Sequence, residues 1–133
     1  MSGEQTESLT GVWHGLYTYR DGQAPGAFVA TLIEAGTSFS GAIHEDSNGD
    51  GLPVRQLNAT VDGRRASQMV TFAKTYDGAD GWDHTVYYEG VLSEDFTEIE
   101  GLWFIPRVVA GRFMMIRNSG RPDAVRRHAV EKA

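Results

Sequence analysis

The chain has 133 residues, a net charge of −6 and no cysteine. This length suits one domain, and the absence of cysteine excludes disulfides, thiol catalysis and cysteine-based zinc sites. The acidic charge disfavours nucleic acid as a partner, and no apolar run approaches the ~20 residues that a membrane-spanning helix needs. We therefore expect a single cytoplasmic domain that binds neither nucleic acid nor membrane.

After a flexible polar leader at 1–9, segments in which apolar and polar residues alternate are separated by turn-forming residues. This alternation predicts β-strands. Eight strands are expected, at 11–19, 27–34, 38–45, 56–61, 68–76, 85–92, 97–105 and 111–118. Asp21-Gly22, Asp62-Gly63 and Asp77-Gly78 follow the first, fourth and fifth of them, and Asp-Gly pairs favour tight hairpin turns.

Short connections between consecutive strands predict antiparallel pairing in chain order. A sheet of eight strands removes its edges by closing, so we predict an all-β fold, an eight-stranded antiparallel up-and-down barrel over residues 10–118. A two-sheet sandwich is the alternative, but it usually needs Greek-key connections. Residues 119–133 are expected to form a tail or a short C-terminal helix, whose start Pro122 and Asp123 favour.

The period-two alternation also predicts which side chains point into the barrel. The first strand carries Trp13, Tyr17 and Tyr19 on one face, and we assign this aromatic face inward. The matching faces of the other strands carry Phe39, Gly41 and Ile43; Val70, Phe72, Lys74 and Tyr76; Ile99, Gly101, Trp103 and Ile105; and Phe113 and Met115.

The opposite faces of the first, seventh and eighth strands are apolar as well. They carry Val12, Leu16, Leu102, Phe104, Met114 and Ile116. In a closed barrel these strands are neighbours, and the resulting patch is larger than a soluble monomer normally leaves exposed. This patch predicts a homodimer, with cover by the terminal helix as the alternative.

Several polar side chains share the inward faces with the aromatic ones: Glu45, Lys74, Tyr76, Tyr88 and Arg117. Ligand pockets are mostly apolar with a few convergent polar groups. A Lys or an Arg inside such a cup suits a carboxylate or a phosphate. The alternative is an ion pair of Glu45 with Lys74 or Arg117 that closes the barrel end without a ligand.

Residues 46–51 match the first half of an EF-hand calcium loop, whose oxygen ligands stand at alternate positions. Leu57, however, stands at the twelfth position, where the EF-hand has a bidentate glutamate. A solvated loop is the favoured interpretation, because Asn-Gly and Asp-Gly are ordinary turn formers. We expect no metal and no cofactor.

Short motifs resemble those of a known barrel group. Leu9-Thr10-Gly11-Val12-Trp13 resembles the opening Gly-x-Trp of calycins, which include lipocalins, fatty-acid-binding proteins and avidins. Avidins are the most similar, because Phe39-Ser40-Gly41, Thr71-Phe72-Ala73-Lys74 and Leu102-Trp103-Phe104 resemble their third, fifth and seventh strands. The resemblance implies a barrel that holds its ligand inside and associates through its outer faces.

The resemblance does not extend to the residues that bind biotin in avidins, so we do not expect biotin as the ligand. Gly15 and Ile43 stand where avidins have an Asn and a Tyr that contact biotin, and Trp103 alone matches a biotin-contacting Trp. We therefore predict a barrel that binds another amphipathic small molecule, with an anionic one as an option. The candidate ligand-binding residues are Trp13, Tyr17, Ile43, Glu45, Lys74, Tyr76, Tyr88, Trp103 and Arg117.

Two other functions are weighed beside small-molecule binding. One is a structural or interaction module that forms homo-oligomers through the outer apolar patch. The other is a small barrel enzyme of isomerase or hydrolase type, with Lys74 and Tyr76 as acid–base groups. Because no motif supplies a nucleophile and a base together, the enzyme is the less favoured interpretation.

Overall fold

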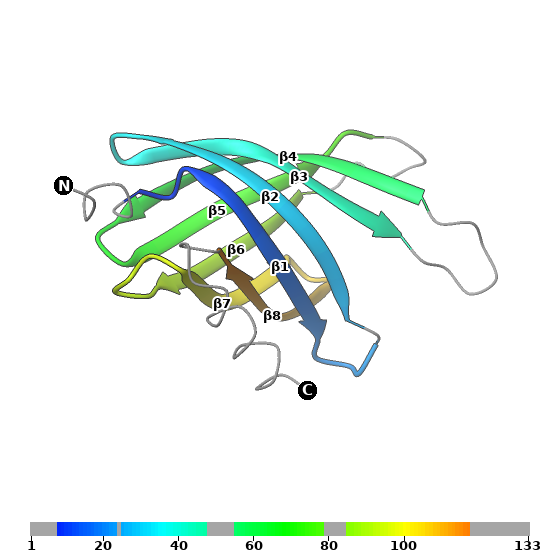
Figure 1. Cartoon of the computed structure of the whole chain (residues 1–133). Coiled ribbons are helices and arrows are strands. Elements are labelled where there is room, and N and C mark those ends of the chain that lie inside the picture. The colour runs from blue at the N-terminus through cyan, green and yellow to red at the C-terminus, as the bar shows by residue number, and fades with distance from the viewer. Residues whose placement is uncertain (1–7, 24, 48–54, 79–84, 118–133) are drawn as a thin grey trace.

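The computed structural model of the chain describes residues 8–23, 25–47, 55–78 and 85–117. The strands are β1 Gly11–Tyr19, β2 Gly26–Ala35, β3 Ser38–Ser47, β4 Arg55–Ala66, β5 Met69–Tyr76, β6 Thr85–Leu92, β7 Glu98–Ile105 and β8 Val109–Ile116. Each strand pairs antiparallel with the next, and β8 pairs with β1 to close a barrel (Figure 1). The predicted eight-stranded antiparallel barrel is confirmed, whereas the tail or helix expected at 119–133 lies outside the described residues.

The predicted end of the fourth strand is wrong. β4 continues through Asp62-Gly63 to Ala66, and the turn follows at Ser67, whose φ is +58°. A Cβ atom on Gly63 would lie 2.4 Å from Cζ of Phe39 and 2.6 Å from Cβ of Phe72. Glycine is needed here because aromatic rings occupy the space of its side chain, and not because the chain reverses.

The predicted inward faces are confirmed, and aromatic rings fill the middle of the barrel. Phe72 stacks on Tyr88 with ring centroids 4.5 Å apart and an interplanar angle of 6°. Phe39 and Phe113 pack edge-on against Phe72 at centroid distances of 5.9 and 6.0 Å. Such offset and edge-on contacts are the geometries that aromatic rings prefer.

The two ends of the barrel differ. The odd-numbered strands finish at one mouth, here called the Lys74 end, and begin at the other, the Trp13 end. At the Trp13 end the guanidinium of Arg117 lies 4.4 Å from the Trp13 ring centroid and donates hydrogen bonds to the carbonyls of Thr10 and Phe96. Leu9 from the predicted leader is fully buried here and accepts a hydrogen bond from the Trp13 indole.

An ion pair between Glu34 and Arg65, at the Trp13 end of the barrel, makes the stability of the fold depend on pH. Arg65 Nε donates to Glu34 at 2.6 Å, and the backbone N–H of Leu9 donates to the same carboxylate at 2.9 Å. Burial acts to raise the pKa of Glu34, but the hydrogen bonds from Arg65 and Leu9 outweigh it and hold the pKa below its ordinary value. A depressed carboxyl pKa stabilises the fold above the unfolded pKa of about 4.3, and this stabilisation is lost as pH falls through the folded value.

We expect Glu34→Gln to lower the free energy of unfolding by about 1–3 kcal/mol at pH 7, because the ion pair and a charged hydrogen bond are lost. The difference in unfolding free energy between the variant and the native chain should become smaller as pH falls from 5 towards 3, where the native carboxylate takes up a proton. Urea unfolding at pH 7 and near pH 3 measures both. The exposed Glu94→Gln is the control, and an unchanged gap at low pH would contradict this role for Glu34.

Candidate functional site

A polar cluster lies at the Lys74 end of the barrel and is here called the Lys74 cluster. It is formed by the buried Glu45, Lys74 and Tyr76 and the half-buried Tyr17. The Lys74 ammonium donates to Glu45 Oε2 at 3.0 Å. The hydroxyls of Tyr76 and Tyr17 donate to Glu45 Oε1 at 3.0 and 3.2 Å. One carboxylate on β3 therefore accepts hydrogen bonds from three donors on β1 and β5. Each of these strands lies two positions away from β3 in the barrel.

Aromatic rings surround the Lys74 ammonium. Its nitrogen lies 4.7 Å from the ring centroid of Tyr76, 5.4 Å from that of Tyr17, 5.5 Å from that of Tyr88 and 5.8 Å from that of Phe28. All four distances are within the ~6 Å reach of a cation–π interaction, which strengthens when the cation is removed from water. Lys74 itself is 2% exposed. The rings and Glu45 together compensate for the lost hydration of the ammonium.

The tyrosines of the cluster are hydrogen-bond donors at neutral pH. Burial raises the pKa of Tyr17, and the neighbouring Glu45 carboxylate raises it further. Burial also raises the pKa of Tyr76, against a smaller lowering by Lys74. Both hydroxyls therefore keep their protons and point them at Glu45.

A cavity of about 130 Å³ adjoins the cluster on the side of β6, β7 and β8. Its lining residues are Tyr17, Tyr19, Lys74, Tyr76, Val86, Tyr88, Trp103, Ile105 and Val109. Trp103 packs edge-on against Tyr17 and Tyr19 at centroid distances of 5.9 and 5.2 Å. Tyr19, Ile105 and Val109 are half-buried, so they form the rim at which solvent reaches the cavity.

The structure brings together six of the nine predicted ligand-binding residues: Tyr17, Glu45, Lys74, Tyr76, Tyr88 and Trp103. The predicted place of Arg117 beside Lys74 is wrong, because β8 runs antiparallel to β1 and β7 and carries Arg117 to the Trp13 end. Trp13 lies there too, under Arg117. Ile43 is a fully buried core residue that pairs with Ala30 and Ala59.

Five residues that line the cavity or the cluster are absent from the predicted site, and one of them, Ile105, shares its strand face with the predicted Trp103. Tyr19 shares its strand face with Tyr17, so the alternation that placed Tyr17 also identifies it. Phe28 lies on a strand for which the sequence predicts no inward face, whereas Val86 shares its strand face with Tyr88, which is predicted to point inward. The predicted eighth strand excludes Val109, because the turn after Pro106 has Arg107, with a φ of +65°, at the position where a glycine usually marks such a turn.

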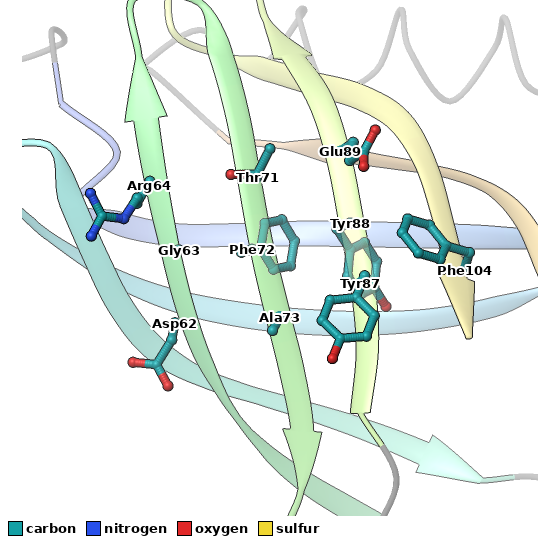
Figure 2. A pocket seen from close by; sticks show the side chains of 10 residues that line it. All are labelled: Asp62, Gly63, Arg64, Thr71, Phe72, Ala73, Tyr87, Tyr88, Glu89 and Phe104. Atoms are coloured by element: carbon teal, nitrogen blue, oxygen red, sulfur yellow. The ribbon is translucent and has the colours of Figure 1, made fainter. Parts of the chain in front are cut away.

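A second hollow, of about 370 Å³, lies on the outer face of β4, β5, β6 and β7 (Figure 2). Tyr87 and Phe104 stack at its side with centroids 5.6 Å apart, and Ala73 forms its floor. Asp62, Arg64, Thr71 and Glu89 surround it and are all exposed. Charges of both signs remain hydrated at such a surface and contribute little to binding. The smaller inner cavity is therefore the better candidate site.

The outer apolar patch is present in part. Val12, Leu16 and Leu102 are 47–53% exposed, whereas Phe104 and Ile116 are half-buried and Met114 is only 8% exposed. The exposed part spans β1 and β7, on either side of β8. The homodimer that this face favours stays a prediction.

Among the residues that the structure describes, no three histidine or acidic side chains lie close enough together to hold a metal ion. Of the calcium-like segment at 46–51, residues 48–51 lie outside the described residues, and 46 and 47 belong to β3. Across the same described ranges, no helix is long and apolar enough to cross a membrane.

Comparison with known proteins adds no family to this geometry. Neither a scan against protein-family models nor a search of curated proteins finds a match to the chain. The likeness to avidins therefore remains a prediction from the residues that carry it, and the inner cavity with its Lys74 cluster is the feature from which function is inferred.

Proposed function

We propose that the chain is a small-molecule-binding barrel whose ligand occupies the cavity at the Lys74 end. The observation that carries this proposal is the cavity itself, whose walls are aromatic and aliphatic while polar groups converge at one end. A mostly apolar pocket with a few convergent polar groups is the usual form of a small-molecule site. The filled middle of the barrel limits the ligand to the mouth.

The size of the cavity indicates a ligand of about one ring. Apolar protein cavities of about 150 Å³ take up molecules the size of benzene. The cavity here, of about 130 Å³, opens at a rim formed by Tyr19, Ile105 and Val109, so a substituent has room to extend outward. A fatty acid or a haem would not fit without large rearrangement.

The charge of the cluster favours a polar but neutral head group. Glu45 neutralises Lys74, so the pair presents no net charge to the cavity. A ligand carboxylate would lose its hydration and meet Glu45 as well as Lys74, which makes its burial costly. A hydroxyl or carbonyl group avoids this cost and can accept a hydrogen bond from the Lys74 ammonium, which carries three N–H donors.

Benzyl alcohol is expected to quench Trp103 fluorescence on titration, because the indole lines the cavity. Benzoate should bind at least about tenfold more weakly, a difference of 1.4 kcal/mol. Trp103→Phe should abolish the signal without abolishing binding by calorimetry. Tighter binding of benzoate would contradict the neutral head group.

A pair of neighbouring substitutions supplies the control. Val109→Phe places a ring at the rim of the cavity and should weaken benzyl alcohol binding at least about tenfold. Val108→Phe adds the same ring one residue earlier, where the side chain is 73% exposed and outside the cavity lining, and should leave binding unchanged. Equal affinity in both variants and the native chain would refute binding in this cavity.

A further inference from the structure

The basic residues of this chain are unevenly chosen. Ten of its twelve Lys and Arg residues are arginine, and the two lysines are Lys74 and Lys132. Among the basic side chains that the structure describes, Lys74 is the one buried inside the barrel. A guanidinium keeps its proton under all ordinary conditions, whereas a buried amine can lose its proton and act as a nucleophile.

The surroundings of Lys74 contain what amine chemistry needs. Glu45 lies 3.0 Å from the amine and can accept its proton. The amine also borders the cavity in which the proposed ligand lies.

From this arrangement we infer that the cavity captures small aldehydes, which form an imine with Lys74. The inference rests on the proposed function, since the aldehyde occupies the same cavity as a neutral ligand. A one-ring aldehyde meets the size limit, and its carbonyl is the polar, uncharged head group that the neutral Lys74–Glu45 pair favours.

The reaction balances without any further reactant. Lys74 passes a proton to Glu45, and the free amine attacks the carbonyl carbon to form the C–N bond. Proton transfer from nitrogen to oxygen gives a neutral carbinolamine. Glu45 then returns its proton to the carbinolamine hydroxyl, the C–O bond breaks and water leaves as the C=N bond forms. The products are one water and a protonated imine paired with the Glu45 carboxylate.

The same groups that hold the ammonium can hold the protonated imine. Its positive charge stays within reach of the rings of Tyr17, Tyr76 and Tyr88, and Glu45 remains its counter-ion. The tyrosine hydroxyls keep Glu45 in place during the proton transfers. Because the carboxylate is positioned and the carbonyl is confined beside the amine, the reacting groups do not need to meet by diffusion in solution.

The test uses the full chain, benzaldehyde and cyanoborohydride, which reduces the imine to a stable benzylamine. Peptide mass spectrometry should find Lys74 benzylated at least about tenfold faster than Lys132 or the N-terminal amine. Val109→Phe should slow labelling of Lys74 by a similar factor and leave Lys132 unchanged, whereas Val108→Phe should alter neither. Lys74→Arg should leave only the slow labelling of the other two amines.

Titration with benzyl alcohol, which has no carbonyl, separates the two proposals. If benzyl alcohol and benzaldehyde both quench Trp103 but Lys74 is labelled no faster than Lys132, the imine is refuted and the binding site stands. If neither compound quenches Trp103 and Lys74 is not labelled preferentially, both proposals fail. Preferential labelling that Val109→Phe does not slow would refute entry through the cavity, and with it the inference.

Discussion

Glu45→Gln is expected to lower the free energy of unfolding by about 3–5 kcal/mol. The substitution leaves the Lys74 ammonium buried without its counter-ion, and breaking one side of a buried ion pair has a cost of this order. The amide oxygen of the glutamine still accepts hydrogen bonds from Tyr17 and Tyr76. The loss of stability therefore reports the effect of the removed negative charge. Urea unfolding at pH 7 measures it, with the exposed Glu89→Gln as the control at about 0.5 kcal/mol or less.

Removing the charge of Lys74 as well should restore most of the loss. The double variant Glu45→Gln/Lys74→Met buries no charge, and neutral replacements of buried ion pairs are often tolerated. Its unfolding free energy should lie within about 2 kcal/mol of the native value, so the two single effects do not add. Additive losses, or a loss below about 1 kcal/mol for Glu45→Gln alone, would show that the pair is not coupled as its geometry indicates.

Gly101→Ala in β7 is expected to lower the free energy of unfolding by about 3 kcal/mol or more. A Cβ atom there would lie 1.9 Å from the carbonyl oxygen of Glu89 and 2.5 Å from the Cα of Gly90, its partner on β6. These are backbone atoms of a paired strand, so no side-chain rotation relieves the contact. The two strands would have to separate at the middle of the barrel.

The neighbouring Leu102→Ala is the matched control for this strand. Leu102 points outward and is 53% exposed, so its truncation should change stability by less than about 1 kcal/mol. The denaturation midpoint should therefore fall far more for Gly101→Ala than for Leu102→Ala, with similar slopes. Comparable midpoints would mean that β6 and β7 adjust to the methyl group, against the close approach seen at Gly101.

The stability and binding predictions meet at one residue pair. The Lys74–Glu45 pair contributes to the fold only while it is intact, yet the imine proposed above requires a proton to move between its members. Both demands are met because Glu45 has three donors, so it remains held by Tyr17 and Tyr76 when the lysine nitrogen changes its bonding. The double variant Glu45→Gln/Lys74→Met should therefore keep most of the native stability but lose aldehyde capture.

Local patterns were sufficient to predict the strands and their faces. Alternation in segments such as 11–19 and 85–92 reproduces the bounds of β1 and β6, because side chains of a half-buried strand alternate between core and solvent over consecutive residues. Turn residues gave the connections at Asp21-Gly22 and Asp77-Gly78. The same signal failed at Asp62-Gly63, where the reason for glycine lies in rings from β3 and β5.

The sequence by itself thus determined the strand number, the antiparallel order and the presence of polar groups on inward faces. Which polar groups meet was decided only by the tertiary structure, because contact across a barrel depends on the register of strands far apart in the chain. That register brings Glu45, 29 residues before Lys74, to 3.0 Å from it. Arg117 lies at the opposite end because β8 runs antiparallel to β1 and β7, and this leaves a neutral Lys74–Glu45 pair beside the cavity.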